Sequence, residues 1–199
     1  MKKIPSWAIT LAALILSVLL AANYLKANTD TVKQIKNSDS DEKVLIIAKS
    51  NYKDIQNALK EYPDDLDAKK ALDSGFIVLE NDGFKGGSAK LWKNFCKKIK
   101  EKKDGAVLIS QFTVEGDAII TYISYKDGTY YFVEDTTRDE FGSQGYENHT
   151  YSSMKRFEED QRYLAVLTTD DELSYEDAKN ADDRKQTAEI LNVRLDALK

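Results

Sequence analysis

Three stretches in the middle of the chain constrain the fold most. They are residues 106–114, 118–125 and 129–135. Each is rich in Val, Ile, Thr, Tyr and Phe, the residue types that strands favour. Short Gly- and Asp-containing turns separate them, and connections this short join antiparallel neighbours. The pattern therefore predicts an antiparallel meander.

The flanking segments predict what the meander packs on. Residues 88–103 place Leu91, Trp92, Phe95 and Ile99 on one apolar face at helical spacing, with Lys residues on the others. Ser88 is expected to cap this helix. Two further strands are expected at residues 76–79 and 163–167. The predicted fold class is α+β, a meander of about four or five strands packed on one or two helices.

The remaining segments give a domain layout. Short helices are expected near residues 52–59 and 66–72, before the core, and a long polar connection at 135–162. Leu191, Leu195 and Leu198 recur at helical spacing, which predicts a C-terminal amphipathic helix. The expected parts are an N-terminal membrane or signal helix at 1–25, a polar stalk at 26–42, a helical lead-in at 43–75, a globular domain at 76–170, and an acidic linker with the terminal helix at 171–199.

The N-terminus predicts export. Residues 4–24 contain no charged residue and follow Lys2 and Lys3. A helix of about 20 apolar residues spans a bilayer, and a basic start stays in the cytoplasm. The same features are typical of a cleavable signal peptide. The first interpretation predicts a single-pass cell-membrane protein that contacts the lipid bilayer through residues 4–24. The second predicts a secreted protein, and both place the rest of the chain outside.

The net charge limits the kinds of partner that we expect, and the cysteine content limits the disulfides. Residues 28–199 carry 26 basic and 34 acidic residues, a net charge of −8. A nucleic-acid partner is therefore not expected, because such proteins present a basic surface. Cys96 is the only cysteine, so no intrachain disulfide forms, and it is expected to be a packing residue.

No sequence pattern predicts a catalytic or metal centre. His149 is the only histidine, which leaves too few ligands for a typical zinc site, and no cofactor is expected. Acidic residues are plentiful at Glu115, Asp117, Asp135 and Asp139. Turn geometry explains Glu115-Gly116-Asp117. Paired carboxylates of a hydrolase and weak cation binding remain alternatives for this set.

Tyrosines gather in the same part of the sequence. Seven of the 11 tyrosines lie between Tyr122 and Tyr163. Packing within the sheet explains such an enrichment, because strands favour Tyr. An exposed aromatic surface for protein recognition is the alternative.

Several motifs occur in an order that resembles the bacterial family known as domain of unknown function 4362. They are Ala71–Val78, the helix with Trp92, Gln111–Ile119, Tyr125–Gly128 and Asp139–Gly142. The resemblance covers about residues 68–170. Thr-Val-Glu-Gly-Asp at 113–117 and Asp-x-Phe-Gly at 139–142 are its most specific parts.

The resemblance implies a small secreted or lipid-anchored envelope protein of Gram-positive bacteria. The chain departs from the family in having Asp82-Gly83 where His-Gly is frequent, and in lacking a late cysteine pair and a lipid-anchoring Cys. The candidate surface or motif residues are Glu115, Gly116, Asp117, Tyr125, Asp135, Asp139, Phe141 and Gly142.

We therefore expect a non-catalytic interaction or accessory domain that meets a protein partner at the cell envelope. The two alternatives are an envelope-acting hydrolase that uses paired carboxylates and a weak cation-binding sensor domain.

Overall fold

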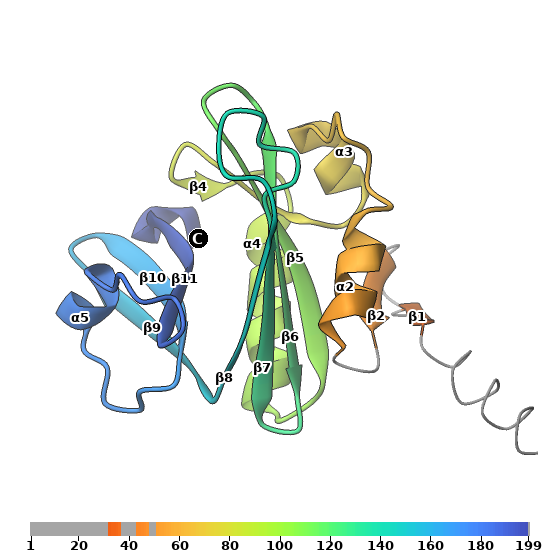
Figure 1. Cartoon of the computed structure of the whole chain (residues 1–199). Helices are drawn as coiled ribbons and strands as arrows, with labels where there is room; N and C mark the ends of the chain where they lie inside the picture. The colour runs from red at the N-terminus through yellow and green to blue at the C-terminus, as the bar shows by residue number, and fades with distance from the viewer. Residues whose placement is uncertain (1–31, 37–42, 48–50, 199) are drawn as a thin grey trace, which may run out of the picture.

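The computed structural model describes residues 32–36, 43–47 and 51–198 (Figure 1). The predicted membrane or signal helix at residues 1–25 lies outside this part of the chain, as does most of the predicted stalk. Within the described ranges, no helix combines the length and the hydrophobicity needed to cross a membrane.

The larger sheet has six strands in the order β4-β3-β5-β6-β7-β8. They are β3 (Ile77–Glu80), β4 (Gly83–Phe84), β5 (Gly105–Phe112), β6 (Ala118–Lys126), β7 (Thr129–Asp135) and β8 (Tyr146–Tyr151). Strands β5 to β8 form the antiparallel meander, whereas β3 joins β5 in parallel. The predicted strands at 106–114, 118–125 and 129–135 are therefore confirmed.

A second, antiparallel sheet has three strands in the order β11-β10-β9. They are β9 (Ser153–Glu159), β10 (Arg162–Thr168) and β11 (Thr187–Arg194). Only Ser152 separates β8 from β9, so one extended run passes from the edge of the larger sheet to the edge of the smaller one. A separate hairpin pairs β1 (Val32–Lys36) with β2 (Lys43–Ile47).

Helices cover both faces of the larger sheet, and the smaller sheet lies on one of them (Figure 1). The helices are α2 (Tyr52–Leu59), α3 (Ala68–Asp73), α4 (Ser88–Lys100) and α5 (Tyr175–Lys179), with a 3-10 turn η1 (Leu195–Leu198). Helices α2 and α3 pack on one face, and α4 together with β10 and β11 packs on the other. The mixed α+β class is therefore confirmed.

The two faces of β5 show why both are buried. Val107 and Ile109 contact the core around Trp92 and Phe95 of α4. Leu108 points to the opposite face, toward α2 and α3, as the alternation of a strand requires. Each large apolar side chain that is fully buried contributes about 1.5–3 kcal/mol to folding. Both faces of the meander therefore stabilise the domain.

The predicted C-terminal helix is wrong, because residues 187–194 form strand β11. Its pairing with β10 skips one residue: Ala165 lies opposite Leu191, whereas Val166 lies opposite Glu189. Ile190 is thus the extra residue of a β-bulge, which breaks the alternation of a regular strand. Of the three leucines whose spacing predicts a helix, only Leu191 lies in β11, whereas Leu195 and Leu198 lie in the 3-10 turn η1.

The predicted long connection at 135–162 is also wrong for about half of its length, because it contains β8 and β9. Both are edge strands, and most of their side chains are only half-buried or exposed. An edge strand tolerates the polar residues that make a sequence look like a loop. The strand at 163–167 is real, but β10 belongs to the smaller sheet and does not extend the meander.

Ser88 does not cap α4. Gly87 occupies the capping position, without a side-chain hydrogen bond. The buried Ser88 hydroxyl instead accepts a hydrogen bond from the Val78 amide, 2.8 Å away. This contact ties the start of α4 to strand β3.

Candidate functional site

Two loops meet at one end of the larger sheet and form a surface that we call the loop tip. It consists of the β5–β6 turn (residues 113–117) and the β7–β8 loop (residues 136–145), which lie together at the top of Figure 1. The Glu140 amide donates a hydrogen bond of 2.9 Å to Oδ2 of Asp117. This bond joins two segments that are 23 residues apart.

The Thr-Val-Glu-Gly-Asp motif builds the first loop. The Thr113 amide donates to the Asp117 carbonyl at 2.9 Å, and the Asp117 amide donates to Oγ1 of Thr113 at 3.1 Å. Gly116 has a φ of 101°, a backbone conformation that glycine adopts far more easily than other residues. The motif therefore encodes a tight turn, and Asp117 extends it to the neighbouring loop.

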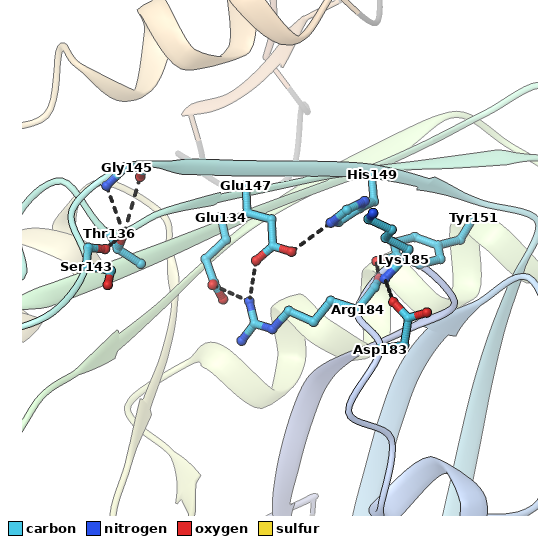
Figure 2. A network of polar contacts seen from close by, with 10 residues as sticks. All are labelled: Glu134, Thr136, Ser143, Gly145, Glu147, His149, Tyr151, Asp183, Arg184 and Lys185. Carbon is cyan, nitrogen blue, oxygen red and sulfur yellow. Dashed lines mark hydrogen bonds and ion pairs between the residues drawn. The ribbon is translucent and has the colours of Figure 1, made fainter.

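The Asp-x-Phe-Gly motif builds the second loop. Oδ1 of Asp139 accepts from the amides of Phe141 at 3.2 Å and Gly142 at 2.8 Å. A Cβ atom on Gly142 would lie 2.2 Å from Oδ2 of Asp139, so this position requires glycine unless Asp139 moves. Thr136 closes the base of the loop through its hydroxyl, which bonds to Ser143 and Gly145 (Figure 2).

Each loop presents one large apolar side chain to solvent. Val114 is 101% exposed and Phe141 is 78% exposed. They are the large hydrophobic residues that remain exposed within the described part of the chain. The acidic residues Glu115 and Glu140 beside them are exposed as well. The loop tip therefore combines two apolar side chains with an acidic rim.

A buried ion pair supports the second loop from below. The Asp135 side chain is 0% exposed and the Arg138 side chain 3%, and Nη1 of Arg138 donates to Oδ2 of Asp135 at 2.8 Å. Oδ1 of Asp135 accepts from the Thr137 amide and hydroxyl at 2.9 and 2.6 Å. Asp135 thus has its hydrogen-bonding capacity engaged within the fold.

The same arginine also holds the end of helix α2. Nη2 of Arg138 donates to the carbonyls of Leu59 at 3.0 Å and Tyr62 at 2.8 Å, and Nε donates to the Pro63 carbonyl at 3.1 Å. The last carbonyls of a helix lack partners within it, and a cation there is favourable. We call Asp135 and Arg138 the helix clamp.

Seven of the eight candidate residues lie at or directly beneath the loop tip, and Tyr125 does not. Tyr125 stands near the other end of β6, opposite Gly105 and Tyr130, and its ring lies 4.9 Å from that of Tyr130. All seven tyrosines between residues 122 and 163 are at least half-buried. This burial favours sheet packing over an exposed aromatic surface.

The three aspartates among the candidates contact the backbone or an arginine. Asp117 and Asp139 accept from loop amides, and Asp135 pairs with Arg138. No group of three or more His, Cys, Asp or Glu side chains suited to a metal ion occurs among the described residues. These contacts support a structural role for the three aspartates.

A second polar network, not predicted from the sequence, lies along β7 and β8 (Figure 2). Arg184, from the segment before β11, pairs with both Glu134 and Glu147, and Glu147 also contacts Nε2 of His149 at 2.8 Å. The hydrogen bond with His149 is the main reason that the pKa of Glu147 is lowered. The Tyr151 hydroxyl donates to the Arg184 carbonyl. The network holds the segment before β11, which contains Arg184, against strands β7 and β8 of the larger sheet.

Cys96 is a buried residue, as expected. Burial between α4 and the smaller sheet raises the pKa of its thiol. A thiol in such a place is a poor nucleophile, because the thiolate is the reactive form.

The comparisons with known proteins bear on the middle of the chain. Residues 85–164 match the model of a family described as Domain of unknown function (DUF4362). This match confirms the resemblance that the motifs indicate, over a shorter stretch than 68–170. Neither a curated protein nor a solved structure matches the chain. The family description states no activity.

Proposed function

We propose that the chain is a non-catalytic interaction or accessory module, held outside a bacterial cell by an N-terminal membrane anchor, whose loop tip binds a protein partner at the cell envelope. The observation that carries this proposal is the exposure of Val114 and Phe141 on two loops that a hydrogen bond joins. Aromatic residues are enriched in protein interfaces, and buried anchors of this kind supply much of the binding energy.

The construction of the loop tip supports a binding role. The turn around Gly116 and the Asp139 hydrogen bonds fix both loops before any partner arrives. A preformed surface loses less conformational freedom on binding, so more of the contact energy becomes affinity. The helix clamp below the second loop adds to this rigidity.

The charges around the loop tip indicate what kind of partner fits. Glu115 and Glu140 flank the two apolar side chains. Anionic lipid would be repelled by this rim, whereas a protein with an apolar pocket and basic edges would be attracted. We therefore expect the partner to be a protein that meets the tip with such a pocket.

The location rests on the sequence. The uncharged run at 4–24, its Lys-rich start and the likeness to envelope proteins all support a single-pass membrane protein with the folded domain outside. Proteolysis of intact cells that carry a C-terminal epitope tests this topology. Loss of the epitope is expected, and its protection would refute an outside location. The mass of the recovered protein tells an uncleaved anchor from a cleaved signal peptide.

Site-specific photocrosslinking in cells tests the binding surface. A photoreactive amino acid at Phe141 of the full chain should give a discrete protein adduct, and the same group at the exposed Glu172, in the segment before α5, should not. Equal labelling from both sites, or none from Phe141, would refute the proposal.

A variant separates recognition from folding. V114S/F141S should leave the melting temperature within about 2 °C of the parent, because exposed substitutions change stability by about 0.5 kcal/mol or less. The adduct formed from a photoreactive group at Glu115 should be lost in this variant. An unchanged adduct would show that the two apolar side chains do not bind the partner.

A further inference from the structure

Helix α4 and the residues directly after it carry a concentration of positive charge. Residues 88–103 contain seven lysines and one acidic residue, Glu101, which gives a net charge of +6. Without this segment, residues 28–199 keep 19 of their 26 basic and 33 of their 34 acidic residues, a net charge of −14. The chain is therefore acidic overall and strongly basic in this one segment.

Four of these lysines lie on one side of α4. Lys90, Lys93, Lys97 and Lys100 are three or four residues apart, so they form one stripe along the helix. All four are exposed, and the stripe lies on the opposite side of the helix from the buried Phe95. We call these four lysines the basic stripe.

The basic stripe has no counter-charge within the fold. In the described part of the chain, no carboxylate lies within ion-pairing distance of any of its four lysines. Glu101, the acidic residue of the segment, pairs with Lys103 instead at 2.7 Å. Like charges three or four residues apart on a helix repel one another. An anionic surface would relieve this repulsion, so the stripe is complementary to such a surface.

The lysines are densest at the end of the larger sheet that lies opposite the loop tip. Lys98 packs beside Gly105, the first residue of β5, and β5 then runs for eight residues, about 25 Å, toward the loop tip. The β6–β7 turn lies at the same end as Gly105. Residues 97–104 and 126–129 together contain six lysines and three acidic residues. This end is therefore basic, whereas the loop tip has an acidic rim.

The length of the chain before β1 indicates which anionic surface is within reach. Seven residues, 25–31, separate the apolar run at 4–24 from Val32, where β1 begins. Seven residues span at most about 25 Å, and the partner strand of β1 contacts β5. A membrane that holds residues 4–24 therefore lies within reach of the folded domain.

We propose that the basic stripe, with Lys102 and Lys103 after it, docks on the anionic lipid headgroups of the membrane that holds the chain's own anchor. This inference rests on the membrane location proposed above. Each lysine close to an anionic lipid surface strengthens the attachment by about fivefold, so several lysines acting together orient the domain. Docking through this end turns the loop tip away from the lipid and toward the proposed protein partner.

Acetylation of lysines in the full chain, reconstituted in lipid nanodiscs, tests the inference. Discs of phosphatidylcholine alone are compared with discs that also contain phosphatidylglycerol, and mass spectrometry measures the rate at each lysine. At low ionic strength, Lys93 and Lys97 should react at least about threefold more slowly in the anionic discs. Lys69 of α3, whose side chain is 84% exposed, should react equally fast in both. About 0.5 M NaCl should remove the protection, because salt screens the attraction.

Two variants with the same change in charge locate the contact. K97Q/K100Q should bring the rate at Lys93 in anionic discs to the value in neutral discs, and glutamine keeps the helix propensity of lysine. K60Q/K69Q removes two exposed lysines from the α2–α3 side and should leave the protection of Lys93 unchanged. Equal loss of protection in both variants would mean that only net charge matters, which would overturn the inference.

Gel filtration of the same samples separates this inference from the proposed location. Elution with both kinds of disc but equal rates at Lys93 would refute the docking and leave the anchor intact. Elution with the anionic discs alone would support the docking and refute the anchor, and elution with neither would refute both. Slow reaction of Lys93 in both kinds of disc would assign the basic stripe to a protein contact, such as a second copy of the chain, and would overturn the lipid assignment.

Discussion

The first prediction concerns the helix clamp, the buried ion pair between Asp135 and Arg138. Arg138→Met removes a guanidinium that donates to Asp135, to the carbonyl of the last residue of α2 and to two carbonyls just after the helix. The methionine fills a similar volume but leaves the Asp135 carboxylate, which is 0% exposed, without a counter-charge. Breaking a buried ion pair from one side costs about 3–5 kcal/mol. We expect a loss of that size from the free energy of unfolding.

The matched control is Arg184→Met, which removes an arginine whose side chain is 48% exposed. Exposed ion pairs contribute about 0–1 kcal/mol, so the same chemical change should cost much less there. In a domain of this size, about 2–4 °C of melting temperature corresponds to 1 kcal/mol. Arg138→Met should therefore lower the melting temperature by about 6–20 °C, and Arg184→Met by about 4 °C at most.

Urea unfolding of the full chain in detergent measures both values. A Trp7→Phe background leaves Trp92, which is 1% exposed, as the only fluorescent tryptophan. The double variant D135N/R138M should be more stable than R138M alone, because it removes the unpaired charge. A cost below about 1 kcal/mol for R138M, or strict additivity in the double variant, would refute the clamp.

Three further predictions concern the turns and the tyrosines. Gly116→Ala should cost about 1–2 kcal/mol in urea unfolding, because its φ of 101° is unfavourable for alanine. Gly145→Ala, which has open space for a Cβ, should be near neutral, and equal effects would contradict this reason. Tyr163→Phe should cost about 1–3 kcal/mol, because the buried Nε1 of Trp92 loses its acceptor at 2.9 Å; an unchanged melting temperature would argue against that bond. Burial raises the pKa of Tyr130 and Tyr163 to about 12, above about 10 in the unfolded chain. Their contribution to stability is therefore complete below about pH 10 and lost between about pH 10 and 12. Tyrosinate absorbance and unfolding measured against pH check this window, and ionisation of both residues near pH 10 in the folded protein would contradict it.

Local patterns predicted the meander well because its determinants are local. The side chains of residues 118–126 and of 129–135 point alternately to the two faces of the sheet. The turns beside these strands contain Gly where the backbone φ is positive. Helix α4 was equally readable, since Trp92 and Phe95 fall on one face and are buried. The loop motifs at 113–117 and 139–142 also showed in the sequence, because each is a turn whose hydrogen bonds lie within a few residues.

Long-range pairing explains what the sequence did not predict. Arg138 meets carbonyls that are 75–79 residues earlier, and Arg184 meets Glu134 from 50 residues later. The local spacing of residues in the sequence does not predict contacts over such distances along the chain. Strand β11 depends in a similar way on its pairing with β10, which the spacing of Leu191, Leu195 and Leu198 does not predict.

The passage of one extended run from β8 into β9 limits how the length of this chain can vary. Tyr151 faces the core beside α4, and Phe157 faces the opposite side of the smaller sheet, against Tyr175. Adding or deleting one residue at Ser152 would turn every later side chain of β9 to the other face. Relatives of this chain should therefore keep the spacing between Tyr151 and Phe157.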